Sequence, residues 1–174
     1  MKKYLLSILI TLLFMPSYLI AQDPEQKLKD KGIILTATSQ PIGNYVNVIR
    51  VGNLLFLSGK GPNKPDGSII IGKVGRDLTL EQGYEAARLV AINHISVLKA
   101  ELGNLNKVKR IVKVLGMVNA TDDFTNHPKV INGYSDFMVE IFGEKGKHAR
   151  SAVGMNSLPS GIAVEVEVIV EVEN

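Results

Sequence analysis

The chain has 174 residues, 20 lysines and arginines against 17 acidic residues, and no cysteine. Without cysteine, disulfides, thiolate catalysis and lipid attachment to a cysteine are excluded. Two of the lysines belong to a predicted export signal, so the rest of the chain carries 18 basic against 17 acidic residues. This near-neutral balance argues against binding along a nucleic-acid backbone, and we expect no nucleic acid as partner. The remaining length fits one domain with its own core.

Residues 1–21 have the pattern of a secretory signal peptide. Two lysines at the start precede the almost entirely apolar residues 4–20, and Ala21 then stands before a polar segment. This order of basic, apolar and small residues is typical of a cleaved signal. A membrane anchor is the alternative, but Pro16 interrupts the stretch, which is also close to the lower length limit for crossing a bilayer. We expect cleavage after Ala21 and a periplasmic or secreted protein with no stable membrane anchor.

The segment before the main apolar runs, residues 22–40, is predicted to be an N-terminal leader. Its first part, residues 22–31, is polar and indicates either a loose segment or a frayed helix. Residues 41–174 are predicted to form a single domain.

A β-hairpin is predicted near the start of this domain. Residues 45–51 and 54–58 are rich in apolar, β-forming side chains, and the Gly52-Asn53 pair between them is a two-residue turn signal. The glycine-rich residues 59–77 indicate a loop, and a short strand at 69–71 is left open.

Two amphipathic helices are predicted in the middle of the chain. Thr79 and Gln82 have the spacing of a capping box, apolar residues then recur at helical spacing, and Gly103 is a stop signal. The second helix opens around Pro128, because proline is tolerated in a first helical turn, and ends at Gly143.

The remaining strands complete a mixed sheet. Residues 111–118 are apolar enough for a covered strand, and the last strand alternates from Ile162 to Val172, with valines on one face and mainly glutamates on the other. The class is α+β, and the two helices cover one face of the sheet. The other face is left uncovered, so we expect this face to pack against further copies of the chain.

The strand around Arg150 and the acidic strand after it are the candidates for chemistry. An arginine is a fixed cation with a planar fork of donors, which suits it to gripping a carboxylate. A carboxylate on the neighbouring strand, such as Glu165, can orient a water or move a proton. The alternative is a structural salt bridge between Arg150 and a glutamate across the sheet. The functional interpretation predicts a small anionic substrate.

Several short motifs, taken in order, resemble one family. They are Gly43-Asn44-Tyr45, Ser58-Gly59, Ala149-Arg150-Ser151, Leu158-Pro159 and Glu165-Val166-Glu167. With these motifs at roughly family spacing, the chain from Ile42 to Val172 resembles the Rid superfamily, the YjgF/YER057c/UK114 group with a chorismate-mutase-like fold. The segment 143–154 is most similar to a divergent branch that is named as L-PSP-type endoribonucleases.

This resemblance implies a homotrimer with ligand sites in clefts between subunits. It also implies hydrolysis of reactive 2-aminoacrylate and related enamines or imines to 2-keto acids and ammonia, with no cofactor or metal. By the resemblance, Arg150 grips the substrate carboxylate and Glu165 positions the attacking water. Tyr45 and Ser58 line the cleft, and Asn132 falls near the family's substrate-binding asparagine.

The chain also departs from the family pattern. Asn132 is offset by one residue, Ala152 replaces a common cysteine, and His148 stands where proline is common. His148 lies on the strand face of Arg150 if the strand is regular, and a proton-transfer role for it is left open. His94 is predicted to be packed or at an interface, and together with His127 the histidines lack metal-ligand spacing.

Three functions follow from the sequence. The first is an exported trimeric enamine/imine deaminase, and the second is a trimer that binds a small carboxylate without turning it over. The third is an endoribonuclease, which the branch name suggests and the near-neutral charge disfavours. Whether the protein is an enzyme is left open at this point.

Overall fold

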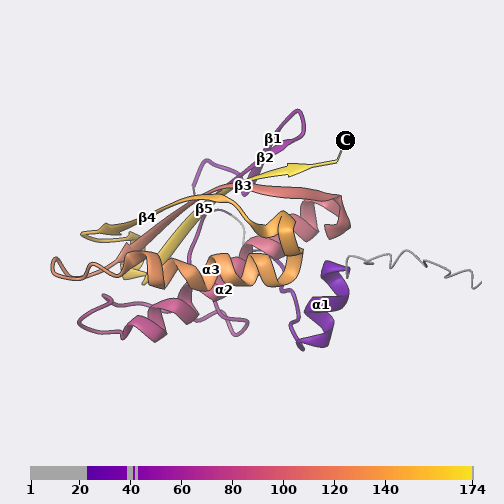
Figure 1. Cartoon of the computed structure of the whole chain (residues 1–174). Coiled ribbons are helices and arrows are strands. Elements are labelled where there is room, and N and C mark those ends of the chain that lie inside the picture. Colours follow the sequence, from indigo (N-terminus) through magenta and orange to yellow (C-terminus); the bar gives the residue numbers. More distant parts are fainter. Residues whose placement is uncertain (1–22, 39–40, 42, 174) are drawn as a thin grey trace, which may run out of the picture.

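The computed structural model of the protein describes residues 23–38, 41 and 43–173. The predicted signal peptide lies outside these residues, and its cleavage stays a prediction. The elements of the described residues follow in chain order (Figure 1): α1 Pro24–Asp30, β1 Val48–Val51, β2 Leu54–Lys60, α2 Leu80–Leu102, η1 Leu105–Lys107, β3 Val108–Asn119, α3 His127–Phe142, η2 Gly143–Gly146, β4 Ala149–Met155, η3 Pro159–Gly161 and β5 Val164–Val172.

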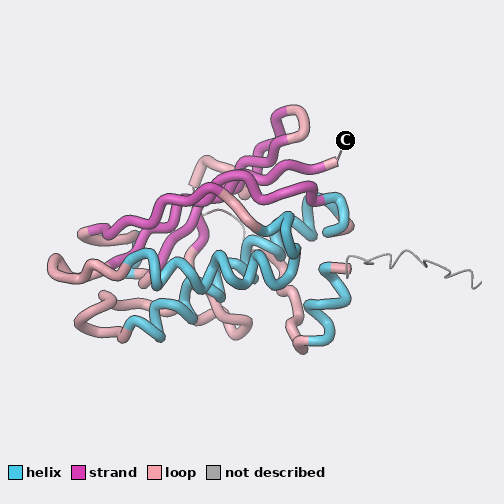
Figure 2. The backbone as a smooth tube through the Cα atoms, viewed as in Figure 1, coloured by secondary structure: helices cyan, strands magenta, loops and turns pink. Residues whose placement is uncertain are grey.

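The strands form one mixed sheet in the order β1-β2-β5-β3-β4. Strands β3 and β4 are parallel and are joined through α3, whereas the other neighbours are antiparallel. Helices α2 and α3 form a layer on one side of this sheet (Figure 2). The predicted α+β class, with a mixed sheet and two helices on one face, is confirmed.

The predicted hairpin is present, with a shorter first strand than expected. Val51 pairs with Leu54 across a turn in which Gly52 has a φ of 59°. Such a left-handed conformation suits glycine, which has no side chain to clash with the backbone. The register between β2 and β5 shifts between Leu57 and Lys60, so the end of β2 is irregular. Residues 69–71 form isolated bridges rather than a named strand.

Both predicted helices begin and end where the sequence indicates. The hydroxyl of Thr79 accepts from the amide of Gln82 at 3.2 Å, and the amide of Thr79 donates to the Gln82 side chain at 2.8 Å. This reciprocal pair satisfies two amides that a helix start leaves without partners. Helix α2 ends at Gly103, whose φ is 70°, and α3 ends at Gly143.

The core lies between the sheet and the two helices. The alternation predicted for the last strand is confirmed, since the five valines of β5 are buried on the helix side. Glu165 and Glu167 point to the other face, where Glu165 is half-buried and Glu167 is exposed. Ala163, just before the strand, is the exception to the pattern, because it is fully buried between backbone bonds to Ile70 and Asn119.

The face of the sheet away from the helices is open and partly apolar. Large apolar side chains are exposed there by between 37% and 60% in two groups, one on β1 and β2 and the other on β4: Ile49, Val51, Phe56, Val153 and Met155. Exposed apolar groups of this kind can mark surfaces that associate.

The leader predicted for residues 22–40 contains a packed helix. Leu28 of α1 is only 3% exposed and belongs to the core. Glu25 forms an ion pair with Lys99 of α2 at 2.7 Å and accepts from the amide of Leu105 at 3.1 Å. Helix α1 therefore packs against the helix layer and is not a loose segment (Figure 1). Among the helices in the described part of the chain, none combines the length and apolar character that crossing a membrane requires.

Candidate functional site

The candidate residues Arg150 and Glu165 lie on opposite faces of the sheet. Arg150 pairs with Val114 of β3, which is buried under the helices, whereas Glu165 pairs with Met117, which has the opposite orientation. Strand β3 also lies between β4 and β5. The expectation that the carboxylate stands on the strand next to Arg150 is therefore wrong. One copy of the chain holds two separate clusters. We name them the arginine cluster, formed by Arg150, Asn132 and Ser135, and the glutamate cluster, formed by Glu165 and the residues around Gly59.

The arginine cluster joins β4 to α3. Nη1 of Arg150 donates to Oδ1 of Asn132 at 3.0 Å and to Oγ of Ser135 at 2.8 Å, and Nη2 donates to the carbonyl of Pro128 at 3.3 Å. The three acceptors are spaced four and three residues apart, so they form one ridge of the helix. Asn132, whose role the sequence left uncertain, is thus brought against Arg150. The predicted salt-bridge alternative for Arg150 finds no carboxylate partner among the described residues.

His148 extends the arginine cluster through a serine. Its Nδ1 lies 2.7 Å from the carbonyl of Gly146, and its Nε2 lies 3.0 Å from Oγ of Ser135. Burial lowers the pKa of His148 below its usual value, and the charge of Arg150 acts in the same direction. The ring is therefore neutral at pH 7, which favours a structural hydrogen bond over the proton-transfer role that was left open for it.

The glutamate cluster lies at the irregular end of β2. A side chain at Gly59 would overlap the carboxylate of Glu165, so the glycine leaves the space that this carboxylate fills. Burial, followed by repulsion from Glu167, raises the pKa of Glu165. Among the described residues, Glu165 has no hydrogen-bond or ion-pair partner. A half-buried carboxylate with a raised pKa and free oxygens is suited to accepting a proton from water.

Tyr45 and Ser58, which were predicted to line a cleft, border the same region. Tyr45 is 55% exposed and lines two adjoining hollows, one beside Ser58 and Glu167 and the other beside Glu165 and Lys60. The hydroxyl of Ser58 already donates to the carbonyl of Val46 at 2.6 Å. Its oxygen therefore remains as an acceptor for a ligand, whereas its proton is in use.

Two residues of these clusters were missed by sequence reasoning. Ser135 lies three residues after Asn132, and this helical spacing is a signal that places both on one face. Lys60 lines the hollow of Glu165, its Nζ donates to Oδ1 of Asn47 at 2.5 Å, and burial lowers its pKa. The irregular end of β2 sets the direction of Lys60, and no sequence pattern indicates it.

A buried hydrogen-bonded pair connects β2 to the helices behind the glutamate cluster. His94 is fully buried as predicted for a packed residue, with Nε2 at 3.2 Å from the carbonyl of Ser58 and Nδ1 at 3.1 Å from the hydroxyl of Tyr134. The carbonyl can only accept, so Nε2 carries the proton and Nδ1 accepts from the phenol. Burial lowers the pKa of His94 to about 4. The neutral ring fixes the strand beside Ser58.

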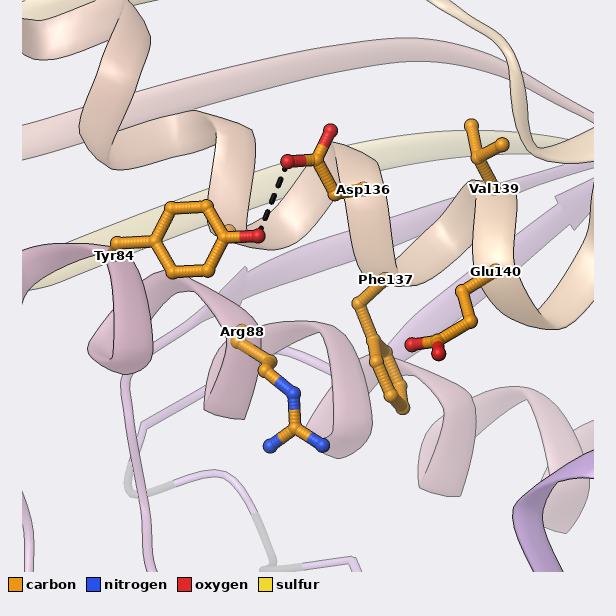
Figure 3. Close-up of a pocket in the computed structure, with 7 residues that line it drawn as sticks. Tyr84, Arg88, Asp136, Phe137, Val139 and Glu140 are labelled. Atoms are coloured by element: carbon orange, nitrogen blue, oxygen red, sulfur yellow. Dashed lines mark hydrogen bonds between the residues drawn. The ribbon is translucent and has the colours of Figure 1, made fainter. Parts of the chain in front are cut away.

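A third hollow lies between α2 and α3 on the outer side of the helix layer (Figure 3). Its polar groups are already paired: the hydroxyl of Tyr84 donates to Asp136 at 3.1 Å, and the guanidinium of Arg88 lies 4.9 Å from the centre of the Phe137 ring. This groove is separate from both clusters, and the hydrogen bond and the cation–π contact hold its polar side chains in place. In the described part of the chain, no three His, Asp or Glu side chains gather as metal ligands.

The close approach of the two helices at this groove gives a stability prediction. A side chain at Gly133 would overlap the backbone carbonyl of Tyr84. Gly133→Ala is therefore expected to lower the free energy of unfolding by about 2 kcal/mol or more, since backbone must move to admit the methyl group. Chemical denaturation measures the change. Gly43→Ala is the matched control, because its methyl group meets the Tyr45 ring only at an ordinary 3.5 Å. Equal stability of the two variants would contradict the close contact.

The chain is thus a small α+β protein, in which Arg150 is held against helix α3 on the helix side of a five-stranded sheet. Residues 25–171 match the family described as "YjgF/chorismate mutase-like, putative endoribonuclease". The chain belongs to this YjgF/Rid family, as the sequence motifs predicted.

Several relatives and solved structures are similar over most of their length. The chain is 43% identical to protein TCP17 of Trypanosoma cruzi over 148 residues, which are 84% of this chain and 92% of the relative. It is 32% identical to the 2-iminobutanoate/2-iminopropanoate deaminase of Dermatophagoides farinae, covering 84% of this chain and all of the relative. The crystal structure of protein Atu1372 from Agrobacterium tumefaciens matches with a TM-score of 0.80 at 40% identity, over 86% and 92% of the two chains. E. coli TdcF with bound serine matches with a TM-score of 0.56 at 25% identity, over 79% and 94%.

Proposed function

We propose that the protein is an exported homotrimeric hydrolase that converts enamines or imines of the 2-aminoacrylate kind to 2-keto acids and ammonia. The observation that carries the proposal is Arg150, a cation held against α3 by Asn132 and Ser135 with no carboxylate partner among the described residues. An arginine that neutral acceptors hold in place, and whose charge no carboxylate of the described residues pairs with, is suited to binding the carboxylate of a small substrate. The similarity to a deaminase that acts on 2-imino acids supports this substrate class.

The trimer is proposed because one copy separates the two clusters. In a closed ring of copies, the open face of one sheet packs against the next copy, and the exposed apolar residues at its edges become covered. The arginine cluster of one copy would then face the glutamate cluster of its neighbour across a cleft. Arg150 would bind the substrate carboxylate from one side, and Glu165 would act from the other.

The proposed reaction adds water across a carbon–nitrogen double bond. After the enamine has tautomerised to the imine, Glu165 accepts a proton from a water that attacks the imine carbon. The proton then passes to the nitrogen and gives a carbinolamine, which carries a hydroxyl and an amino group on the same carbon. Glu165 next accepts the proton of this hydroxyl and returns it to the amino group, the carbon–nitrogen bond breaks, ammonia leaves and a 2-keto acid remains. The pKa of Glu165 is raised towards neutral pH, and a group that both accepts and returns a proton works best when its pKa is close to the working pH.

Turnover of imino acids tests this proposal directly. The mature chain, starting at Gln22, is mixed with imines that an amino-acid oxidase generates, and release of keto acid is followed. We expect acceleration over buffer, and a loss of about 100-fold or more in Arg150→Ala, because the substrate carboxylate loses its charged partner. Asp136→Asn, on the exposed side of the same helix, is the control and is expected to keep its activity. Rates equal to buffer for the wild-type protein would refute the hydrolase.

Binding without turnover is the second candidate, and TdcF with bound serine favours it, since serine also carries a carboxylate. Calorimetry with pyruvate separates the two. Binding that Arg150→Ala abolishes, without keto-acid release from imines, would assign a carboxylate-binding trimer. RNA cleavage that survives in Arg150→Ala would instead point to the endoribonuclease that the family description names.

Export is proposed from the first 21 residues alone. Expression of the whole chain in bacteria, followed by mass spectrometry of the purified protein, tests it. A mature N-terminus at Gln22 in the periplasmic or secreted fraction is the expected result, and an intact start in the cytoplasmic fraction would contradict it.

A further inference from the structure

The arginine cluster contains a hydrogen-bond chain whose directions can be assigned. The carbonyl of Gly146 can only accept, so Nδ1 of His148 carries the proton of this neutral ring. Nε2 must then accept, and the hydroxyl of Ser135 donates to it. The lone pairs of Ser135 are left to face Arg150, whose Nη1 donates to this oxygen at 2.8 Å. The order is therefore Arg150 to Ser135 to His148 to Gly146, and each proton has one direction.

The same contacts determine which edge of the guanidinium is free. The acceptors of both terminal nitrogens, Asn132 and Ser135 for Nη1 and Pro128 for Nη2, lie on one ridge of α3. The edge between Nη1 and Nη2 thus faces the helix. Among the described residues, Nε–H and the second N–H of Nη2 have no acceptor. These two donors form the side edge of the fork, which fits the two oxygens of a carboxylate.

We propose that Ser135 and His148 are positioning residues, which hold the end edge of Arg150 against α3 so that a substrate carboxylate binds side-on through Nε and Nη2. This proposal deepens the proposed function and rests on it for the identity of the ligand. Neither residue touches the reacting atoms. Ser135 acts through Arg150, and His148 acts through Ser135 by fixing the direction of its hydroxyl.

The geometry explains why Ser135 is needed beside the other two acceptors. Without it, one bond to Asn132 and a longer one of 3.3 Å to the carbonyl of Pro128 remain, and the guanidinium is held less firmly. The second acceptor on Nη1 restrains the guanidinium further, and a fork that is already oriented loses less entropy on binding. The burial of His148 keeps this hydrogen-bond chain, from Arg150 through Ser135 to His148, in one protonation state at pH 7.

A double-mutant cycle, measured as the affinity of the mature protein for pyruvate, tests whether Ser135 acts through Arg150. Ser135→Ala is expected to weaken binding about ten-fold, the effect of losing a hydrogen bond to a charged group. Ser135→Thr keeps the hydroxyl and is expected to restore affinity. In an Arg150→Lys background, which keeps a cation but loses the fork, Ser135→Ala is expected to have little further effect, because the fork that Ser135 orients is gone. Ser157→Ala, at an exposed serine outside the cluster, is the matched control. A loss of the same size in both backgrounds would show that Ser135 acts independently and would overturn the proposal.

Nuclear magnetic resonance of the free protein separates this proposal from the proposed function. Nitrogen shifts of His148 are expected to show the Nδ1–H tautomer, and rotation about the Cζ–Nη1 bond of Arg150 is expected to be slow. Ser135→Ala and His148→Ala are both expected to speed this rotation. If wild-type protein binds no pyruvate but shows slow rotation that depends on Ser135, the ligand is wrong and the positioning role stands. An Nε2–H tautomer, or rotation unchanged by Ser135→Ala, would refute the positioning role whatever the ligand.

Discussion

Trimers mixed from Arg150→Ala and Glu165→Gln subunits are expected to regain activity that neither variant has alone. The two residues lie on opposite faces of one sheet, so in the proposed trimer a complete site takes one of them from each of two copies. If each site takes Arg150 from one subunit and Glu165 from the next, equal random mixing restores about one quarter of the sites in a closed ring. Each variant alone is expected to lose about 100-fold or more in rate.

The experiment uses the two variants unfolded and refolded together, with keto-acid release from imines as the measurement. Each variant refolded alone controls for recovery. A double variant with both changes, mixed with Glu165→Gln, is the matched control, because no subunit in that mixture carries Glu165. Full activity of a monomeric wild-type fraction, or no regain on mixing, would contradict a site shared between copies.

Acid is expected to destabilise the protein through His94. Burial holds the pKa of this ring at about 4 in the folded chain, below the ordinary value of 6.5. The neutral ring therefore contributes stability that is fully present above pH 6.5 and is lost as the pH falls towards 4. The shift corresponds to roughly 3 kcal/mol of unfolding free energy between pH 7 and pH 4.

Urea denaturation of wild type and His94→Gln at several pH values measures this effect. The amide of glutamine cannot titrate, so the variant is expected to be less stable at pH 7 and to approach wild type near pH 4. Other shifted groups, such as Glu25 with its lowered pKa and Glu165 with its raised one, titrate in both proteins and cancel in the difference. A constant difference between the two proteins across this range would refute the assignment.

Local signals predicted most of the fold. The capping box at Thr79, the turn at Gly52 and the alternation of the last strand each depend on residues close together in the chain, and each was confirmed. Helix α1 was only partly anticipated. Its docking depends on the burial of Leu28 and on the Glu25–Lys99 pair, which joins residues 74 positions apart. Contacts of this kind leave no periodic signal in a sequence.

The candidate site was harder to predict than the fold. Arg150 and Asn132 were both named as candidates from the sequence, and the helix crossing from β3 to β4 brings them together. Their separation from Glu165 was missed, because the strand order is not the chain order: β3 is inserted between β4 and β5. Ser135 was missed although its spacing from Asn132 indicates a shared helix face, since a serine on a helix is usually a neutral surface residue.

The attachment of α1 to the helix layer has a practical consequence for preparing the protein. A purification tag placed ahead of Asp23 would be joined directly to α1, which packs against the helix layer and not against the open face of the sheet (Figure 1). A truncation that starts after Asp30 would instead remove Leu28 and the Glu25 ion pair, and would expose part of the core. Expression designs that treat these residues as a dispensable tail would therefore yield a less soluble protein.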